Sequence, residues 1–338
     1  MASQLTILPV IIQPKKDELF SSWLFRLACK NFSKAHTFCR FHLPGYSIWN
    51  RDIDRLASDQ MINRLALLTE IPIQTIYQLT LRSYENIIFV EVNKTTKQKW
   101  VLPLGIYHRT WKNFGLQYCP RCLSRDSEPY FRKSWRLSMS VVCTECQLLL
   151  HDCCPNCLSP ISFFRTDVRF KIAIAPKAIT ICPKCDFDLK ESPRYSPMLG
   201  TKGFQIKINK IIETNRWRKD YSSLEYLNVL YQILKILKSE SSVFKPFNDL
   251  ILDSESMRIS KLAKSKDFET LTTIEREQLI RIGCWLLEDW PERFISISKE
   301  AKLNTSAALR DSKSLPFWFV SEVNRLHRPT AIELNPKK

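Results

Sequence analysis

Four Cys-x-x-Cys pairs contain eight of the twelve cysteines, and this spacing is typical of metal binding. Two thiolates three residues apart on a tight turn can bind one side of a tetrahedral ion, and a second pair can bind the other side. Taking neighbouring pairs together predicts two structural zinc ions. The expected ligands are Cys119, Cys122, Cys143 and Cys146 for the first ion, and Cys154, Cys157, Cys182 and Cys185 for the second. His151 and Cys153 are alternative ligands beside these pairs.

The same cysteines exclude several kinds of chemistry. Four thiolates fill the coordination shell of zinc, so neither ion should keep an open position for a substrate. A thioredoxin-like redox pair is the alternative for a single Cys-x-x-Cys, but four such pairs favour metal. The zinc-enzyme motifs H-x-E and H-E-x-x-H are absent. The glycine-rich phosphate loops of P-loop ATPases and Rossmann dehydrogenases are absent as well.

Carboxylates offer one more catalytic alternative, because two or three that converge can bind the metal ions of a nuclease or transposase. No spacing among the acidic residues singles out such a group, and the candidates are Asp52, Asp54, Asp59, Asp253, Glu255, Asp289 and Glu292. We therefore expect a protein that is not an enzyme.

The charge of the chain points to an anionic partner. Lys and Arg total 51 against 34 Asp and Glu, which gives a net charge of +17 and favours nucleic acid as a neighbour. Basic residues interleaved with aromatic ones suit contact with a phosphate backbone and stacking on bases. We expect contact with nucleic acid or a partner at two groups: Arg132, Lys133 and Arg136, and Lys207, Lys210, Arg216, Arg218 and Lys219. A solvated surface without a ligand is the alternative for either group.

The N-terminal part of the chain should be helical. Apolar residues at helical spacing predict a helix over residues 14–30. They also predict two helices within residues 59–81, joined by a turn at Ile71-Pro72, with Ile73 among the residues that face inward. This pair suits a helix-turn-helix, and two helices that merely pack together are the alternative. The alternating residues 86–103 predict a β-hairpin.

The zinc region should be followed by a second helical part. Short ribbon strands are expected at residues 141–142 and 178–181, and the prolines of residues 192–200 predict a linker. Helices are expected over residues 224–237 and 273–289, the latter with Ile274 facing inward. The predicted fold is mainly α with small β zinc ribbons. Its domains are an N-terminal helical domain with a helix-turn-helix-like pair (1–114), a tandem zinc-finger module (115–192) and a C-terminal helical domain (193–338).

Several of these segments together resemble the TniQ family of Tn7-like transposon proteins. The stretch PKKDELFSSWLFRLA, which starts at Pro14 and contains Glu18 and Arg26, resembles the opening motif of that family. Residues 118–157 are similar to its zinc core, and residues 285–294 to its C-terminal W-P-x-x-F segment. The family often has His as the fourth ligand of the first zinc site, where this chain has Cys146. Residues 201–270 carry no such resemblance.

The resemblance implies a transposition target-selection protein. TniQ proteins join a target-recognising module to the AAA+ regulator TnsC, which then recruits the transposase. Shorter members are adaptors on a CRISPR effector such as Cascade, whose guide RNA reads the target DNA, and Cascade adaptors form homodimers. Longer members, called TnsD, read an attachment site themselves. At 338 residues the chain is nearer the adaptor kind, and a direct sequence-specific DNA binder is the alternative.

The expected location is the bacterial cytoplasm, at the nucleoid. No apolar run approaches the roughly 18 residues that a membrane span needs, so no membrane partner is expected. The first residues also lack the basic region and the cleavage site of a signal peptide.

Overall fold

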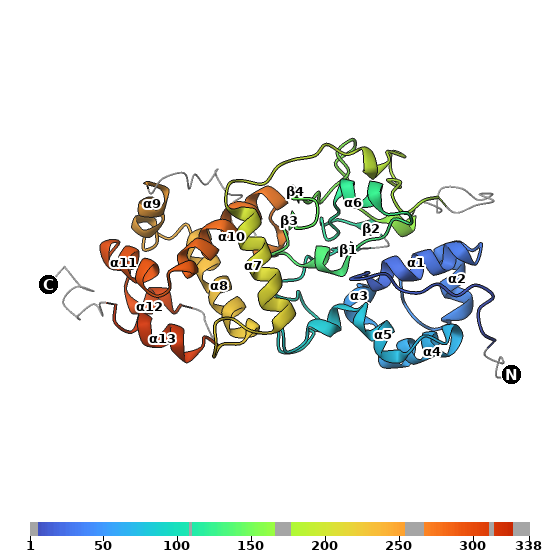
Figure 1. Cartoon of the computed structure of the whole chain (residues 1–338), viewed down its shortest axis with the longest axis horizontal. Helices are drawn as coiled ribbons and strands as arrows, with labels where there is room; N and C mark the ends of the chain where they lie inside the picture. The colour runs from blue at the N-terminus through green and yellow to red at the C-terminus, as the bar shows by residue number, and fades with distance from the viewer. Residues whose placement is uncertain (1–5, 108–109, 166–176, 254–266, 311–313, 327–338) are drawn as a thin grey trace. The chain divides into compact units, whose positions relative to one another are not determined.

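A computed structural model describes residues 6–107, 110–165, 177–253, 267–310 and 314–326. The chain forms two compact units, Met1–Pro197 and Met198–Lys338. The described residues are mainly helical, as predicted, with thirteen α-helices and four short strands (Figure 1). None of the helices in these ranges combines the length and the apolar character needed to cross a membrane.

Helix α1 is the centre of the first unit, because every residue from Phe20 to Ala28 is buried. It begins at Phe20, later than predicted, because Asp17 adopts a left-handed conformation with φ of 55°. Helix α4 has the same length as α1, 11 residues, and the other α-helices of this unit are shorter. The six are α1 (Phe20–Lys30), α2 (Ala35–His42), α3 (Ile53–Leu56), α4 (Asp59–Thr69), α5 (Ile73–Gln78) and α6 (Pro120–Arg125).

The predicted helix pair within residues 59–81 is present as α4 and α5. Ser58 caps α4 by accepting the backbone N–H of Met61, and the left-handed Glu70 ends it. Pro72 then precedes α5, consistent with the fixed φ of proline at a helix start. Ile73 was expected to face inward but is 53% exposed.

The hairpin predicted over residues 86–103 is wrong. Asn86 and Trp100 have φ of 60° and 68°, which an extended ladder does not accept. Between them, the side chain of Asn93 accepts the backbone N–H groups of Thr95 and Thr96 and closes a turn. The strands of the described chain lie further on and form two hairpins: β1 (Ile106–Tyr107) with β2 (Thr110–Trp111), and β3 (Val142–Cys143) with β4 (Leu148–Leu149). The strand expected at residues 178–181 is reduced to a single bridge between Ile181 and Asp188.

Short 3₁₀ helices complete both units. They are Leu81–Tyr84, Lys133–Arg136, Phe163–Arg165, Leu189–Glu191 and Phe268–Thr270. The division at Pro197 falls within the predicted linker. Residues 1–114 and 115–192 lie in one unit, so the three-part layout stays a prediction.

The second unit is built on α7, α8 and α10, which pack side by side. Capping boxes begin both α8 and α10, with Ser222 paired to Glu225 and Thr272 to Glu275. The two helices approach closely at Gly283, where a Cβ would lie 2.7 Å from a methyl group of Leu230. The α-helices are α7 (Thr201–Thr214), α8 (Ser223–Lys238), α9 (Lys245–Asp253), α10 (Thr273–Glu288), α11 (Glu292–Glu300), α12 (Thr305–Ala308) and α13 (Phe317–Val323).

The predicted helices over residues 224–237 and 273–289 therefore match α8 and α10 closely. Ile274, which lies in the first turn of α10 and was expected to face inward, is 57% exposed. Pro291 precedes α11, as its position in the sequence indicates.

Candidate metal centres and a basic pocket

The four cysteines of the first predicted group come together between α6 and the β3–β4 hairpin. Cys119 is the N-cap of α6 and Cys122 lies in its first turn, while Cys143 ends β3 and Cys146 lies in the following turn. Their sulfur atoms all lie within 4.8 Å of one another, and all four residues are buried. The Sγ of Cys122 is 3.5 Å from that of Cys143 and 3.5 Å from that of Cys146.

The second predicted group also assembles, with four sulfur atoms within 4.8 Å of one another. The Sγ–Sγ distance is 3.6 Å between Cys154 and Cys185 and 3.7 Å between Cys157 and Cys182. This group is less enclosed than the first, because Cys157 and Cys185 are half-buried.

Three of the four Cys-x-x-Cys pairs form the same kind of turn. The residue after the second cysteine is left-handed, and it donates its backbone N–H to the carbonyl of the first cysteine, at 2.7, 2.8 and 3.0 Å. These residues are Gln147, Leu158 and Asp186, with φ of 60°, 53° and 59°. The remaining pair uses the start of α6 instead, where Pro120 occupies the first helical position. Both the left-handed turn and the helix start direct the two sulfur atoms of a pair to the same side.

Each cysteine group fits zinc. A regular tetrahedron with Zn–S bonds of about 2.3 Å places its sulfur atoms about 3.8 Å apart, close to the distances between the four sulfur pairs above. In the first group, S–H donation by Cys119 and then Cys122 lowers the pKa of the Cys143 thiol, while the pKa values of the Cys119 and Cys122 thiols are raised. Each group could therefore hold one zinc ion. Four thiolates leave no open position, which suits a structural role.

The alternative ligands His151 and Cys153 belong to neither group among the described residues. The ring of His151 lies between those of Tyr118 and Tyr195, with centroids 5.3 and 5.4 Å away. Its Nε2 is 2.7 Å from the carbonyl oxygen of Pro193. His151 therefore contributes to packing beside the metal centres.

Arg136, one of the predicted contact residues, is fully buried in the first unit. Its guanidinium donates to Asp52 and Asp54, each at 2.8 Å, and to the carbonyl oxygen of Leu102 at 3.1 Å. Asp54 also accepts the backbone N–H of Ser21 at 2.7 Å. The two carboxylates considered above for catalysis thus link α1 and α3 to the zinc region through Arg136.

Arg132 and Lys133 are also buried and satisfied within the first unit. Arg132 pairs with Asp126 at 3.0 Å and lies over the rings of Tyr130 and Trp135. The Nζ of Lys133 donates to the carbonyl oxygen of Gln78 and to the hydroxyl of Ser83, each at 2.6 Å. Such buried cations cannot reach a phosphate without disrupting their partners, so we do not carry forward a contact role for Arg132, Lys133 and Arg136.

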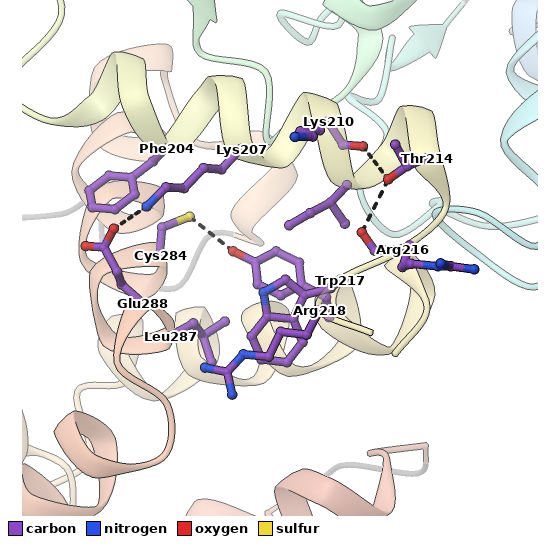
Figure 2. Close-up of a pocket in the computed structure, with 12 residues that line it drawn as sticks. Phe204, Lys207, Lys210, Thr214, Arg216, Trp217, Arg218, Cys284, Leu287 and Glu288 are labelled. Atoms are coloured by element: carbon purple, nitrogen blue, oxygen red, sulfur yellow. Dashed lines mark hydrogen bonds and ion pairs between the residues drawn. The ribbon is translucent and has the colours of Figure 1, made fainter. Parts of the chain in front are cut away.

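The second basic group surrounds a cavity of about 650 Å³ in the second unit (Figure 2). Lys207, Lys210, Arg216 and Arg218 line it, while Lys219 does not. Its other lining residues come from α7, α8, α10 and the segment after α7. They are Phe204, Ile211, Thr214, Trp217, Tyr226, Cys284, Leu287 and Glu288.

The loop between α7 and α8 is held in a defined shape. Asn215 ends α7 with φ of 49°, and its side-chain oxygen accepts the hydroxyl of Ser223 at 2.6 Å. Trp217 and Tyr221 exchange backbone hydrogen bonds of 2.7 and 3.3 Å around the left-handed Arg218. This loop therefore presents its basic side chains on a fixed backbone.

Aromatic packing supports the same wall of the pocket. The ring of Trp217 lies 5.1 Å from that of Tyr226 and 4.9 Å from that of Trp318. The guanidinium of Arg218 lies 4.7 Å above the Trp217 ring and donates to the carbonyl oxygen of Trp290 at 3.1 Å. Figure 2 shows Arg218 beside the indole of Trp217.

The pocket carries an excess of positive charge. Glu288 is its one acidic lining residue, against four cations, and it pairs with Lys207. The thiol of Cys284 accepts the hydroxyl of Tyr226, and burial raises the pKa of that thiol to about 12. Cys284 is therefore a packing residue and not a nucleophile. The pocket is suited to binding an anion.

A comparison with protein families identifies the N-terminal part of the chain. The family model TniQ matches residues 9–150. Residues 9–150 belong to the TniQ family. A search of curated proteins finds no match. The TniQ domain supports a transposition-associated role of the Tn7-like kind.

The matched residues contain α1 to α6 and the first cysteine group. The match ends at Leu150, so the second cysteine group and the basic pocket lie outside it. Within the TniQ domain, Glu18 and Arg26 of the opening motif form a buried ion pair of 2.7 Å. Arg26 also donates to Glu128, next to the zinc core.

The sequence did not reveal the partners of the buried cations or the pocket itself. The distance in sequence between Arg26 and Glu128, or between Lys207 and Glu288, leaves no periodic signal. The sequence did contain a signal for a different ion pair. The opening motif of the TniQ domain places Glu18 and Arg26 eight residues apart, and these two side chains form an ion pair.

Proposed function

We propose that the chain is a non-catalytic adaptor that links a target-recognising complex to the AAA+ regulator TnsC. The match of the TniQ domain to residues 9–150 carries this proposal. In the TniQ adaptors that the chain resembles, the guide RNA of a CRISPR effector such as Cascade reads the target. The adaptor then needs contact with protein and nucleic-acid backbone, and no base reading of its own.

The chemistry of the described side chains supports an adaptor. Both cysteine groups have the four thiolates that close a tetrahedral site. Asp52 and Asp54 are held by Arg136 and are not available to bind the metal ions of a nuclease. Asp52 and Asp54, two of the carboxylates considered for catalysis, thus stabilise the fold.

The helix pair α4–α5 gives little support to the alternative, a direct DNA reader of the TnsD kind. Helix α5 has only six residues, IQTIYQ, and contains neither Lys nor Arg. Arg82, which follows it, donates to Asp59 and to the carbonyl oxygen of Ala57. A recognition helix needs cations beside it to hold the DNA backbone, and this pair provides few.

We place the nucleic-acid contact of the adaptor in the second unit. The contact residues in this proposal are Lys207, Lys210, Arg216, Arg218 and Lys219, which are all exposed. We also expect the chain to act as a homodimer when it is bound to an effector, as the resemblance to Cascade adaptors implies.

Selection from random duplex DNA tests the proposal against its alternative. The full chain is incubated with a pool of random duplexes at 0.15 M salt, and the bound DNA is sequenced over several rounds. An adaptor should enrich no motif, and its binding should fall steeply with added salt because phosphate contacts release counterions. Enrichment of one motif would contradict the adaptor and favour a direct selector of an attachment site.

A further inference from the structure

The basic pocket of the second unit combines two cations that have no carboxylate partner among the described residues with a largely apolar lining. We propose that this pocket binds one unpaired nucleotide of a nucleic-acid strand, with the phosphate at Lys210 and Arg216 and the base against Phe204. The inference rests on the proposed contact of this basic group with nucleic acid. The inference adds the class of ligand, a nucleotide, and says which lining residues contact its phosphate and which contact its base.

Lys210 and Arg216 are the lining cations of the pocket that remain available for phosphate. The hydroxyl of Thr214 lies 2.8 Å from the carbonyl oxygen of Lys210 and 3.4 Å from that of Arg216, so it ties the two backbones together (Figure 2). Both side chains are exposed, and within the described ranges no carboxylate pairs with either. A guanidinium with no carboxylate partner can bind a phosphate through two parallel hydrogen bonds, and an ammonium can bind a phosphate as a point charge.

The apolar part of the pocket lining suits a planar ring. Phe204, Ile211 and Leu287 contribute apolar surface, and the guanidinium of Arg218 forms a flat layer on Trp217. Unpaired bases stack both on aromatic rings and on guanidinium planes. A ligand that consists of a phosphate alone would not contact these apolar and stacked side chains.

The size of the cavity favours a whole nucleotide. At about 650 Å³ it lies within the range of roughly 300–1,000 Å³ that is usual for small-molecule sites. A base that is paired and stacked inside a duplex cannot enter such a pocket unless it leaves the stack. The pocket should therefore distinguish a single strand, in which bases are free, from a duplex.

Binding of labelled 20-nucleotide strands to the full chain at 0.15 M salt tests the inference. The probes are single-stranded oligo-dT, an abasic strand of the same length and phosphate number, and a duplex. A base contact should make oligo-dT bind at least about 5-fold more tightly than the abasic strand. Phe204→Ala should reduce this ratio towards one and leave the affinities for the abasic strand and the duplex unchanged.

The variant Lys210→Ala/Arg216→Ala tests the phosphate end against a matched control. Loss of two phosphate contacts should make the slope of log K against log salt shallower by about 1.4 for a single strand. The control Lys202→Ala/Lys299→Ala removes the same charge from residues of this unit that do not line the pocket, and it should keep the original slope. Thermal unfolding of each variant verifies that the second unit remains folded.

Five results would overturn the inference. Equal binding of the abasic strand and oligo-dT would show that no base is bound, and equal loss in the two double variants would show a diffuse charge effect. Binding of free thymidine monophosphate as tightly as the strand would assign the pocket to a free nucleotide. Displacement by oligo-glutamate, with no effect of thymidine monophosphate, would assign it to an acidic peptide. If no nucleic acid binds at all, the proposed contact fails together with the inference, whereas base-independent binding refutes the inference alone.

Discussion

Replacement of Cys122 by Ser should remove one of two zinc ions from the chain. The sulfur of Cys122 is buried and lies 3.5 Å from those of two other ligands, so an oxygen with a shorter bond cannot reach the same position without moving α6. Cys154→Ser should remove the other ion. The purified wild type should then contain two equivalents of zinc and each variant one, because the two groups share no ligand.

The energetic effect should be large for the first unit. Structural zinc contributes about 10–16 kcal/mol of apparent binding free energy in small domains, which equals or exceeds the roughly 5–15 kcal/mol that stabilises a typical protein. We expect Cys122→Ser to unfold the region around β3 and β4 and to expose α6 to protease. Cys153→Ser is the matched control, because Cys153 adjoins Cys154 but belongs to neither group.

Elemental analysis of the purified proteins, followed by limited proteolysis, measures both effects. Two equivalents of zinc in Cys122→Ser, or a loss of zinc in Cys153→Ser, would refute the ligand assignment. One equivalent in Cys122→Ser together with an unchanged protease pattern would refute the structural role.

The other expectations concern stability and metal release. Arg136→Met should destabilise the first unit by about 3–5 kcal/mol in urea unfolding, since it leaves the buried Asp52 and Asp54 without their cation; a loss below 1 kcal/mol would contradict this. Gly115→Ala should lower the free energy of unfolding by about 1–3 kcal/mol, because a Cβ there would lie 2.7 Å from the carbonyl oxygen of Pro103. In the control Gly203→Ala, the new Cβ has no atom within 4 Å, so this variant should not be destabilised. A chelator should remove zinc faster from the half-buried second group than from the first, as measured in the Cys122→Ser and Cys154→Ser variants; the reverse order would contradict the difference in burial.

The sequence predicted best what depends on local spacing. The Cys-x-x-Cys pairs predicted both cysteine groups, because a tight turn between two cysteines leaves few ways to complete a tetrahedron. Amphipathic spacing predicted α8 and α10, and Ser222 and Thr272 mark their starts. The turn at Pro72 was also evident, because proline fixes its own φ and restricts the residue before it.

Features that depend on distant partners could not be predicted. Arg132, Lys133 and Arg136 look like a basic surface in the sequence, and only the fold brings Gln78 to Lys133 and Asp52 to Arg136. The basic group after Gly200 faces a pocket because α10 supplies the opposite wall more than 60 residues later. The failed hairpin over residues 86–103 has a local cause, since left-handed residues other than glycine give no clear sequence signal.

Reconstitution of the bridging step tests the central claim most directly. A guide-loaded effector complex on its target DNA is immobilised, and TnsC is added with ATP in the presence or absence of the full chain. The adaptor account predicts that TnsC is retained only when the chain is present, and that retention does not depend on any DNA sequence beyond the guide match. Retention of TnsC by the effector alone, or by the chain on an attachment site without an effector, would contradict it.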